Sequence, residues 1–187
     1  MEEEDQSKYP IAVILDLDGT LISEVASIYD STFLRPGAVQ LINWLFENFE
    51  TVGIWTAATK WWFEEQYRTH FEPIITRPFH LTWFVERCVE VSRGEAFMLD
   101  AMPGRVKIKP LVKIVESPFG KERGITLKNI LIVDDTTQTY ERNYGNAIPV
   151  KRYYGEPDDI ELELVKMEIL KKVMKHRIYG TVRPVGL

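Results

Sequence analysis

Three short apolar runs, each followed at once by small polar or acidic residues, constrain the fold of this chain more than any other feature. They occupy residues 11–15 (IAVIL), 51–55 (TVGIW) and 129–133 (NILIV). Short continuous runs of branched apolar residues are typical of strands that are buried on both faces of a parallel sheet. Segments of helical periodicity separate the runs, so we expect an α/β domain with a mainly parallel central sheet.

The expected helices are defined by the spacing of their apolar residues. The first helix opens at residues 35–37 (RPG), where Pro36 suits an early helical position. Its core face repeats at helical spacing and comprises Ala38, Leu41, Ile42, Leu45 and Phe49. Residues 60–71 form another helix, whose aromatic residues we interpret as core rather than as a base-stacking platform: Trp61, Trp62, Phe63, Tyr67 and Phe71. Acidic residues near 157–159 favour the start of a last helix, with a core face of Leu162, Val165, Ile169 and Val173.

The pattern between the second and third strands is less regular. Residues 74–91 are β-like, and residues 92–105 contain two glycines and a proline, which indicates turns or a hairpin. Beyond the third strand, residues 140–145 indicate the end of a helix and residues 147–150 a short strand.

The composition is that of a soluble globular protein, with 187 residues, 45% hydrophobic and 27% charged. We expect residues 9–178 to form a single domain, between a flexible lead-in at 1–8 and a tail at 179–187. No apolar run approaches the roughly 20 residues of a membrane span, and the acidic N-terminus is unlike a secretory signal. A single cysteine, Cys88, excludes an internal disulfide and is interpreted as a buried structural residue. These features favour an intracellular location, cytoplasmic or nuclear.

The formal net charge of −5 argues against a broad nucleic-acid-binding face. A local basic cluster remains, which we interpret first as a solvated loop and alternatively as a basic patch. Its members are Lys107, Lys109, Lys113, Lys121, Arg123 and Lys128.

Acidic or hydroxyl residues follow all three strands. Asp16 and Asp18 leave the first, Thr56 the second, and Asp134 and Asp135 the third. Because ligands of parallel sheets bind beyond the carboxyl ends of the strands, we expect these side chains to share one crevice. An isolated Asp-x-Asp is usually a turn or cap, whereas Asp-x-Asp-Gly-Thr-Leu directly after a buried strand is far more specific.

The segment VILDLDGTLI resembles the first signature of the haloacid dehalogenase superfamily, Asp-x-Asp-x-Thr. The resemblance implies a Rossmann-like haloacid dehalogenase fold. It also implies that Asp16 attacks phosphorus to form an aspartyl-phosphate, and that Asp18 protonates the leaving oxygen and then activates water. Thr20 completes the signature and is expected to help bind the substrate. A carboxylate is a competent covalent nucleophile for this transfer.

The other signatures of the superfamily have matches in the same order. Thr56 matches the second, so its hydroxyl and the N–H of Ala57 are expected to hold a phosphoryl oxygen, although Thr56 can also cap a helix over residues 58–70. Lys109 is the preferred match to the third, a lysine that neutralises phosphate and nucleophile, with Lys107 and Lys113 as alternatives.

Asp134 and Asp135 match the fourth signature. Converging carboxylates would repel a phosphate dianion, and a hard cation with oxygen ligands, Mg²⁺, resolves that repulsion. We expect ligands from Asp16, from the backbone carbonyl of Asp18, and from one or both of Asp134 and Asp135.

Wider similarity, over roughly residues 9–175, is to the RNA polymerase II C-terminal-domain phosphatase group, including its small members. It rests on residues 35–37, the Trp-Thr-Ala-Ala form of the second signature, the acidic pair, WFVERCVEV and NAIPV. The similarity implies a phosphatase of phosphoserine or phosphothreonine in proteins. Gly19, where that group usually has Glu or Gln, and the stretches 93–105 and 109–134 depart from its pattern.

The chain between Thr20 and Arg35 is too short for a large cap domain, so we expect only a small β insert beside an open crevice. Trp61, Trp62 or Arg87 can line the approach of a phosphorylated protein or peptide. The alternatives are a phosphatase of small phosphate esters or of polynucleotide ends, disfavoured by the negative charge, and a catalytically silent protein-binding relative. The sequence has neither the Cys and Arg spacing of cysteine phosphatases nor a Gly-Lys-Ser/Thr phosphate loop.

Overall fold

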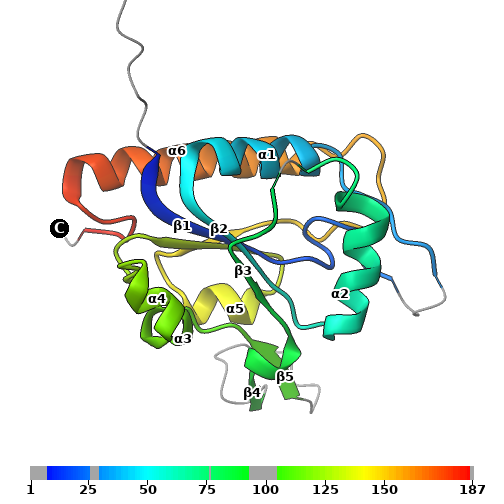
Figure 1. Ribbon diagram of the computed structural model, residues 1–187, viewed down its shortest axis with the longest axis horizontal. Helices are drawn as coiled ribbons and strands as arrows, with labels where there is room; N and C mark the ends of the chain where they lie inside the picture. Colours follow the sequence, from blue (N-terminus) through cyan, green and yellow to red (C-terminus); the bar gives the residue numbers. More distant parts are fainter. Residues whose placement is uncertain (1–7, 26–29, 76, 93–104, 186–187) are drawn as a thin grey trace, which may run out of the picture.

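The computed structural model describes residues 8–25, 30–75, 77–92 and 105–185, and it has a five-stranded sheet at its centre (Figure 1). The strand order is β3-β2-β1-β6-β7, and every pairing in it is parallel. The strands are β1 (Tyr9–Leu15), β2 (Phe49–Trp55), β3 (Leu81–Trp83), β6 (Ile130–Asp134) and β7 (Ala147–Pro149). The predicted α/β class with a mainly parallel sheet is confirmed.

Helices cover both faces of the sheet (Figure 1). One face carries α1 (Ala38–Asn48) and α6 (Glu161–Tyr179). The other carries α3 (Val112–Glu116), α4 (Pro118–Glu122) and α5 (Thr137–Arg142).

The segment between β2 and β6 supplies the remaining elements. α2 (Lys60–Gln66) continues into a π-helical turn (Tyr67–Phe71), and a 3₁₀ turn (Val85–Arg87) follows β3. β4 (Val89–Ser92) and β5 (Arg105–Ile108) form a separate antiparallel pair. This pair is the predicted small β insert.

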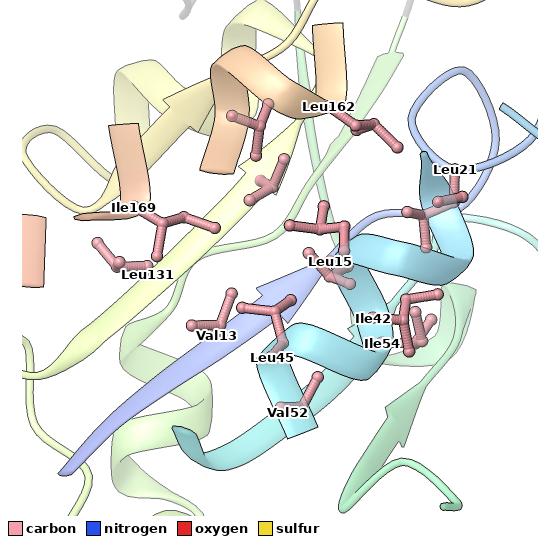
Figure 2. Close-up of a cluster of buried hydrophobic side chains, with 14 of the residues drawn as sticks. Val13, Leu15, Leu21, Ile42, Leu45, Val52, Ile54, Leu131, Leu162 and Ile169 are labelled. Carbon is pink, nitrogen blue, oxygen red and sulfur yellow. The ribbon is translucent and has the colours of Figure 1, made fainter. Parts of the chain in front are cut away.

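Alternation along the strands divides the core into two layers. Val13 and Leu15 of β1 face α1 and α6 (Figure 2), whereas Ala12 and Ile14 join the layer under α3 and α4. All four are at most 2% exposed. Burial on both faces explains why this strand is apolar at every position rather than at every second one.

The last helix packs as its spacing predicts. Its four core-facing residues, Leu162, Val165, Ile169 and Val173, are all buried in the layer shared with α1. In the first helix the prediction was wrong at one position. Phe49 is buried, but it begins β2, and Phe46 is the residue that fills the last core position of α1.

The β-like pattern over residues 74–91 overstates the amount of strand. Among the described residues of this segment, only Leu81–Trp83 and the start of Val89–Ser92 are strand, because turns occupy residues 72–74 and Val85–Arg87. Most of the predicted turn or hairpin at 92–105 lies outside the described residues, although β4 and β5, which flank it, do pair antiparallel.

The limits of the domain, expected at residues 9 and 178, stay a prediction. β1 begins at Tyr9, and within the expected tail Val182 is buried and donates its backbone N–H to Lys128 O at 2.9 Å. Within the part of the chain that is described, no helix combines the length and the apolar character needed to cross a membrane.

Candidate active site

The carboxyl ends of three adjacent strands bring the candidate residues together. Asp16 directly follows β1, Thr56 directly follows β2, and Asp134 is the last residue of β6. Because β1 lies between β2 and β6 in the sheet, these three ends are immediate neighbours. The shared crevice expected from the sequence is therefore present.

Lys109 is the centre of the charge arrangement. Its side chain is 3% exposed, and its Nζ donates to Asp16 Oδ1 and, at 2.8 Å, to Asp134 Oδ2. The interpretation of this part of the basic cluster as a solvated loop was wrong for Lys109. The exposed Lys107 lines the cleft beside it, whereas Lys113 donates to Arg87 O at 2.6 Å.

Burial and charge act in opposite directions on this ion-paired group. Burial disfavours the charged form of Lys109, but Asp134 and Asp16 outweigh it and raise the pKa of Lys109, so it stays positively charged. Burial raises the pKa of Asp16; Lys109 opposes that rise, and Asp134 and Asp135 add to it. A further positive charge at this position would therefore favour the ionised form of Asp16.

Asp18 has different partners from Asp16. Trp62 Nε1 donates to Asp18 Oδ1 at 2.7 Å, and Thr56 Oγ1 donates to Asp18 Oδ2 at 3.4 Å. Burial raises the pKa of Asp18, and these two hydrogen bonds oppose the rise. Asp18 therefore holds a proton more readily than an ordinary aspartate, which suits a group that must donate one.

Thr56 is buried and does not cap a helix. Its hydroxyl accepts from the N–H of Ala58 at 3.0 Å, while the N-cap of α2 is Thr59, which accepts from the N–H of Trp62 at 3.3 Å. The expected helix cap at Thr56 was therefore wrong by three residues. Ala57 lines the cleft beside Thr56, as a phosphate-binding role for its N–H requires.

Thr20 lies beneath the site. It is fully buried, and its hydroxyl donates to Asp16 Oδ2 at 3.2 Å. Its contact is thus with the candidate nucleophile, and its expected contact with substrate stays a prediction.

Asp135 is paired with a cation that the sequence did not single out. Arg152 Nε donates to Asp135 Oδ2, and the Asp135 side chain is only 2% exposed. Gly19 makes room for this pair, because a Cβ at Gly19 would lie 2.7 Å from Asp135 Oδ2. Gly19 also has a φ of 76°, which a side chain would strain. Gly19, which departs from the C-terminal-domain phosphatase pattern, therefore leaves the space that the Asp135–Arg152 pair occupies.

Three carboxylates fit a divalent cation. Asp16, Asp134 and Asp135 each offer one oxygen, and these oxygens lie within 4.8 Å of one another. Their acceptors are hard oxygens, the ligand type that Mg²⁺ and Ca²⁺ prefer. The cluster can therefore bind a divalent metal. The side chain of Asp18 is not part of the cluster, because its two oxygens accept hydrogen bonds from Trp62 and Thr56.

The crevice is a cleft of about 600 Å³ whose lining includes Asp16, Asp18, Lys109 and Asp135. Trp61 and Trp62 line one side, and Trp61 is 59% exposed. Interpreting all the aromatic residues of this segment as core was therefore wrong for Trp61, whereas Phe63 and Phe71 are buried. Arg87 stacks on the Trp83 ring at 5.2 Å and is not among the described residues that line the cleft.

Asn143, at the end of α5, fixes the backbone around Lys109. Its Nδ2 donates to Lys109 O at 2.8 Å, and its Oδ1 accepts from the N–H of Leu111 at 2.9 Å.

Cys88 immediately precedes β4 and is half-buried rather than placed within a strand. Its Sγ contacts Thr56 O at 3.8 Å, and burial raises the pKa of its thiol.

Comparison with known families decides the affiliation. The model of the NLI interacting factor-like phosphatase family matches residues 11–180. The chain belongs to this family. The matched span includes Asp16, Asp18, Thr56, Lys109 and the Asp134–Asp135 pair. No curated protein sequence matches the chain.

Solved structures show how the fold of this NLI interacting factor-like member is shared. A putative β-phosphoglucomutase from Thermotoga maritima is 11% identical, with a TM-score of 0.51 over 82% of this chain and 90% of that chain. At this identity the likeness concerns the fold alone, and the predicted haloacid dehalogenase fold is confirmed. Within the described residues no large cap domain is present.

Two structures of RNA polymerase II CTD phosphatases are also similar. The fission yeast phosphatase Fcp1, as a variant bound to beryllium fluoride, is 14% identical with a TM-score of 0.46, over 89% of this chain and 51% of that chain. A structure of Fcp1, described as an essential RNA polymerase II CTD phosphatase, is 16% identical with a TM-score of 0.45, over 89% and 49%. The chain thus spans about half the length of these two proteins.

Three residues of the site were not predicted: Trp62 as a partner of Asp18, Arg152 and Asn143. Trp62 was within a segment interpreted as core, and helical periodicity alone does not tell which aromatic side chain turns toward a strand end. Arg152 and Asn143 follow no recognisable motif. A sequence signal for Arg152 exists in hindsight, since the glycine at position 19 leaves space for a long side chain.

Proposed function

We propose that this protein is a magnesium-dependent phosphomonoester hydrolase that works through an aspartyl-phosphate on Asp16. The observation that carries the proposal is the placement of Lys109 between Asp16 and Asp134, with Asp135 completing a three-carboxylate cluster. A buried lysine and a cation site beside one carboxylate supply the charge that an incoming phosphate dianion needs.

In the first step Asp16 Oδ attacks phosphorus, and the bond between phosphorus and the ester oxygen breaks. Asp18 gives its proton to the departing oxygen, so the product leaves as a neutral alcohol. The hydrogen bonds from Trp62 and Thr56 hold the Asp18 carboxyl in position for that transfer. Such general acid assistance contributes roughly 10² to 10⁴ in rate.

In the second step Asp18, now ionised, takes a proton from water as the water oxygen attacks the phosphorus of the aspartyl-phosphate. The bond from phosphorus to Asp16 breaks, and inorganic phosphate and the free carboxylate result. Lys109 and the N–H of Ala57 hold phosphoryl oxygens during both steps. A divalent cation bound by Asp16, Asp134 and Asp135, with the Asp18 carbonyl, would neutralise charge on the phosphate.

The proposed substrate is phosphoserine or phosphothreonine in a protein. Membership of the NLI interacting factor-like phosphatase family supports this class. The cleft supports it too, because its exposed wall carries Trp61, which can pack against the residues that flank a phosphorylated side chain.

Hydrolysis of an aryl phosphate, with and without chelator and added Mg²⁺, tests the enzymatic proposal. We expect activity with Mg²⁺ and none with chelator. Asp16→Asn should abolish turnover in a folded protein, and Asp18→Asn should reduce it strongly. Asp158→Asn is the matched control, since Asp158 is exposed in the loop before α6. Wild-type activity in folded Asp16→Asn, or no activity with any metal, would contradict the proposal, and the latter result would favour a silent protein-binding relative.

A panel of substrates tests the proposed class separately. Values of kcat/KM are compared for phosphoserine and phosphothreonine peptides, phosphotyrosine peptides, sugar phosphates and nucleotide 3′-phosphates. We expect the serine and threonine peptides to give the highest values. A preference for a sugar phosphate or a nucleotide would replace the substrate class and leave the role of Asp16 intact.

A further inference from the structure

Helix α6 has two apolar faces, of which only one is used by the fold. The inner face packs on the sheet and α1 (Figure 2). Apolar side chains, each between 47% and 65% exposed, form a second row on the opposite side of the helix and at its N-cap. This row, here called the outer stripe, comprises Ile160, Leu164, Met167, Met174 and Ile178.

The outer stripe follows a regular heptad spacing. Its positions advance by four and three residues alternately from Ile160 to Ile178, with Lys171 in the one position that is not apolar. Lys171 forms an ion pair with Glu168 on its own helix at 2.5 Å, which leaves its aliphatic stem along the stripe. At 1.5 Å per residue the stripe is about 27 Å long. A regular stripe of this length is the pattern by which helices pair along a seam.

Charge is distributed unequally along the same helix. Glu161, Glu163 and Glu168 lie in its N-terminal half. Its C-terminal half is basic and carries Lys171, Lys172, Lys175 and Arg177. In heptad terms, Glu161, Glu163, Lys175 and Arg177 flank the stripe on its two sides. A parallel copy would bring Glu163 next to an acidic residue, whereas an antiparallel copy brings Glu161 and Glu163 next to basic ones.

We propose that the outer stripe binds a second copy of this chain, with the two α6 helices antiparallel about a two-fold axis level with Ile169. That register places Ile160 opposite Ile178, and Leu164 opposite Met174, of the second copy. At the flanking positions, whose pairs are centred one residue to either side of Ile169, Glu163 approaches Arg177 and Glu161 approaches Lys175 of the second copy. The apolar and charged pairings thus require the same axis, which is the self-complementarity of a two-fold interface.

The position of α6 leaves this interface accessible. α6 lies beside α1 in the helical layer on one face of the sheet (Figure 1), and the residues of its outer stripe are 47–65% exposed. The candidate active site is built by the carboxyl ends of the strands and by α2, so both copies would keep it open to substrate. The proposal is independent of the proposed function.

Sedimentation equilibrium over a series of concentrations tests the proposal with the full chain. We expect the average mass to rise from 21.8 kDa toward twice that value. The double variant Leu164→Gln/Met174→Gln changes only exposed positions, so it should fold normally and remain monomeric. A wild-type protein that stays monomeric at every concentration, or a Gln variant that still dimerises, would overturn the proposal.

Charge reversal tests the antiparallel register. Glu163→Arg faces Arg177, and Arg177→Glu faces Glu163, so each variant alone should dimerise about tenfold more weakly or worse. An equimolar mixture of the two restores both opposite-charge pairs and should dimerise like the wild type. Glu122→Arg, an exposed reversal on α4, is the matched control and should have no effect. Tighter dimerisation of Glu163→Arg alone would indicate parallel helices and would overturn the register.

Discussion

Asp16 and Asp18 leave the same strand two residues apart and meet different surroundings. Asp16 is buried against the cation of Lys109, whereas Asp18 receives a hydroxyl and an indole N–H. Burial raises the pKa of both carboxyls; Lys109 opposes the rise for Asp16, whereas hydrogen bonds from Trp62 and Thr56 oppose it for Asp18. A cation bound beside Asp16 would favour its ionised form further. Two chemically identical side chains thereby become suited to nucleophilic attack and to proton transfer.

Trp62→Phe should reduce kcat because it removes the donor to Asp18 and keeps the aromatic ring. A hydrogen bond to a charged group contributes ~1.5 kcal/mol or more, which corresponds to roughly tenfold in rate. Steady-state kinetics on an aryl phosphate measures the effect. Trp61→Phe is the control: the exposed neighbour should change KM for peptides and leave kcat on the aryl phosphate almost unaltered. Equal kcat values for Trp62→Phe and wild type would remove the positioning role.

Lys109→Met should lower kcat by about 10² to 10³, the usual loss on removing one donor from an anion site. The loss follows because Lys109 is the buried cation that contacts both Asp16 and Asp134. Lys107→Met, at an exposed position of the same cleft, should stay within about tenfold of wild type. Circular dichroism checks that both variants fold. The opposite order of effects would assign the phosphate-neutralising lysine to Lys107.

The residues that the sequence could predict are those placed by the backbone itself. Asp16, Thr56 and Asp134 follow parallel strands, so their meeting follows from topology. Trp62 and Arg152 were not predicted, because each reaches the site from a helix or a loop through a long side chain whose direction is set by tertiary packing.

At the scale of elements, Arg35 connects segments that the site depends on. Its buried guanidinium donates to both carboxylate oxygens of Asp159, each at 2.8 Å, ahead of α6. It also donates to Thr20 O at 3.2 Å and to Lys151 O at 2.8 Å. One side chain thus holds together the turn after β1, the loop after β7 and the start of the last helix.

Arg35→Met should destabilise the fold by ~3–5 kcal/mol, the usual cost of leaving one member of a buried ion pair without its partner. Arg68→Met is the matched control, because Arg68 forms an exposed pair with Glu65 on one helical surface. It should change the free energy of unfolding by no more than about 0.5 kcal/mol. Urea unfolding measures both. Equal small effects would mean that Asp159 and the two carbonyls find other hydrogen-bond partners, which would contradict the bridging role of Arg35.

His80 links the stability of the β2–β3 pairing to pH. Its Nδ1 accepts from the N–H of Val52 at 3.0 Å, which requires an unprotonated nitrogen. Burial lowers the pKa of His80 below its usual 6.5. The contact of Nδ1 with Val52 O opposes this shift, and the charges of Arg123, Lys8 and Arg77 add to it. Well above pH 6.5 both the folded and the unfolded chain carry a neutral imidazole at position 80. As the pH falls, the unfolded chain binds the proton before the folded chain does, so the free energy of unfolding decreases.

We therefore expect the free energy of unfolding to fall between about pH 7 and pH 5, and His80→Asn to make this decrease shallower. Asparagine can accept the same N–H and does not titrate. His176→Asn leaves the contact with Val52 in place and should retain the steeper dependence. Urea unfolding at several pH values gives the comparison, and identical slopes for His80→Asn and wild type would contradict the link.

The boundaries of helices and strands could be predicted where an element is buried on one face or on both faces. They were harder to predict where an apolar residue lies between two elements or in a turn. β1, β6 and the inner face of α6 follow their apolar patterns. Phe49 and residues 74–91 do not, because an apolar residue satisfies the end of a helix as well as the start of a strand, and turns can bury aromatic side chains without strand pairing.

At the scale of the whole molecule, the site concentrates negative charge inside a stable fold. Asp16, Asp134 and Asp135 lie together with Lys109 and Arg152 as their described cationic partners. Three buried carboxylates remain mutually repulsive even when two cations are nearby. The fold should therefore gain stability from any divalent cation that binds the cluster, and the gain can be measured without turnover.

Mg²⁺ should raise the thermal midpoint of unfolding, since a ligand that binds only the folded state stabilises it by mass action. At a concentration a hundred times its Kd the gain is ~2.7 kcal/mol, or roughly 5–10 °C for a chain of this size. Ca²⁺ should also raise the midpoint but support turnover poorly, because its looser coordination would misplace the nucleophile. In Asp134→Asn/Asp135→Asn the repulsion is relieved and the ligands are lost, so the midpoint should no longer respond to either cation. Asp158→Asn should respond as the wild type does. A double variant that keeps the full shift would place the cation elsewhere, and a wild type that shows no shift would remove the metal from this cluster.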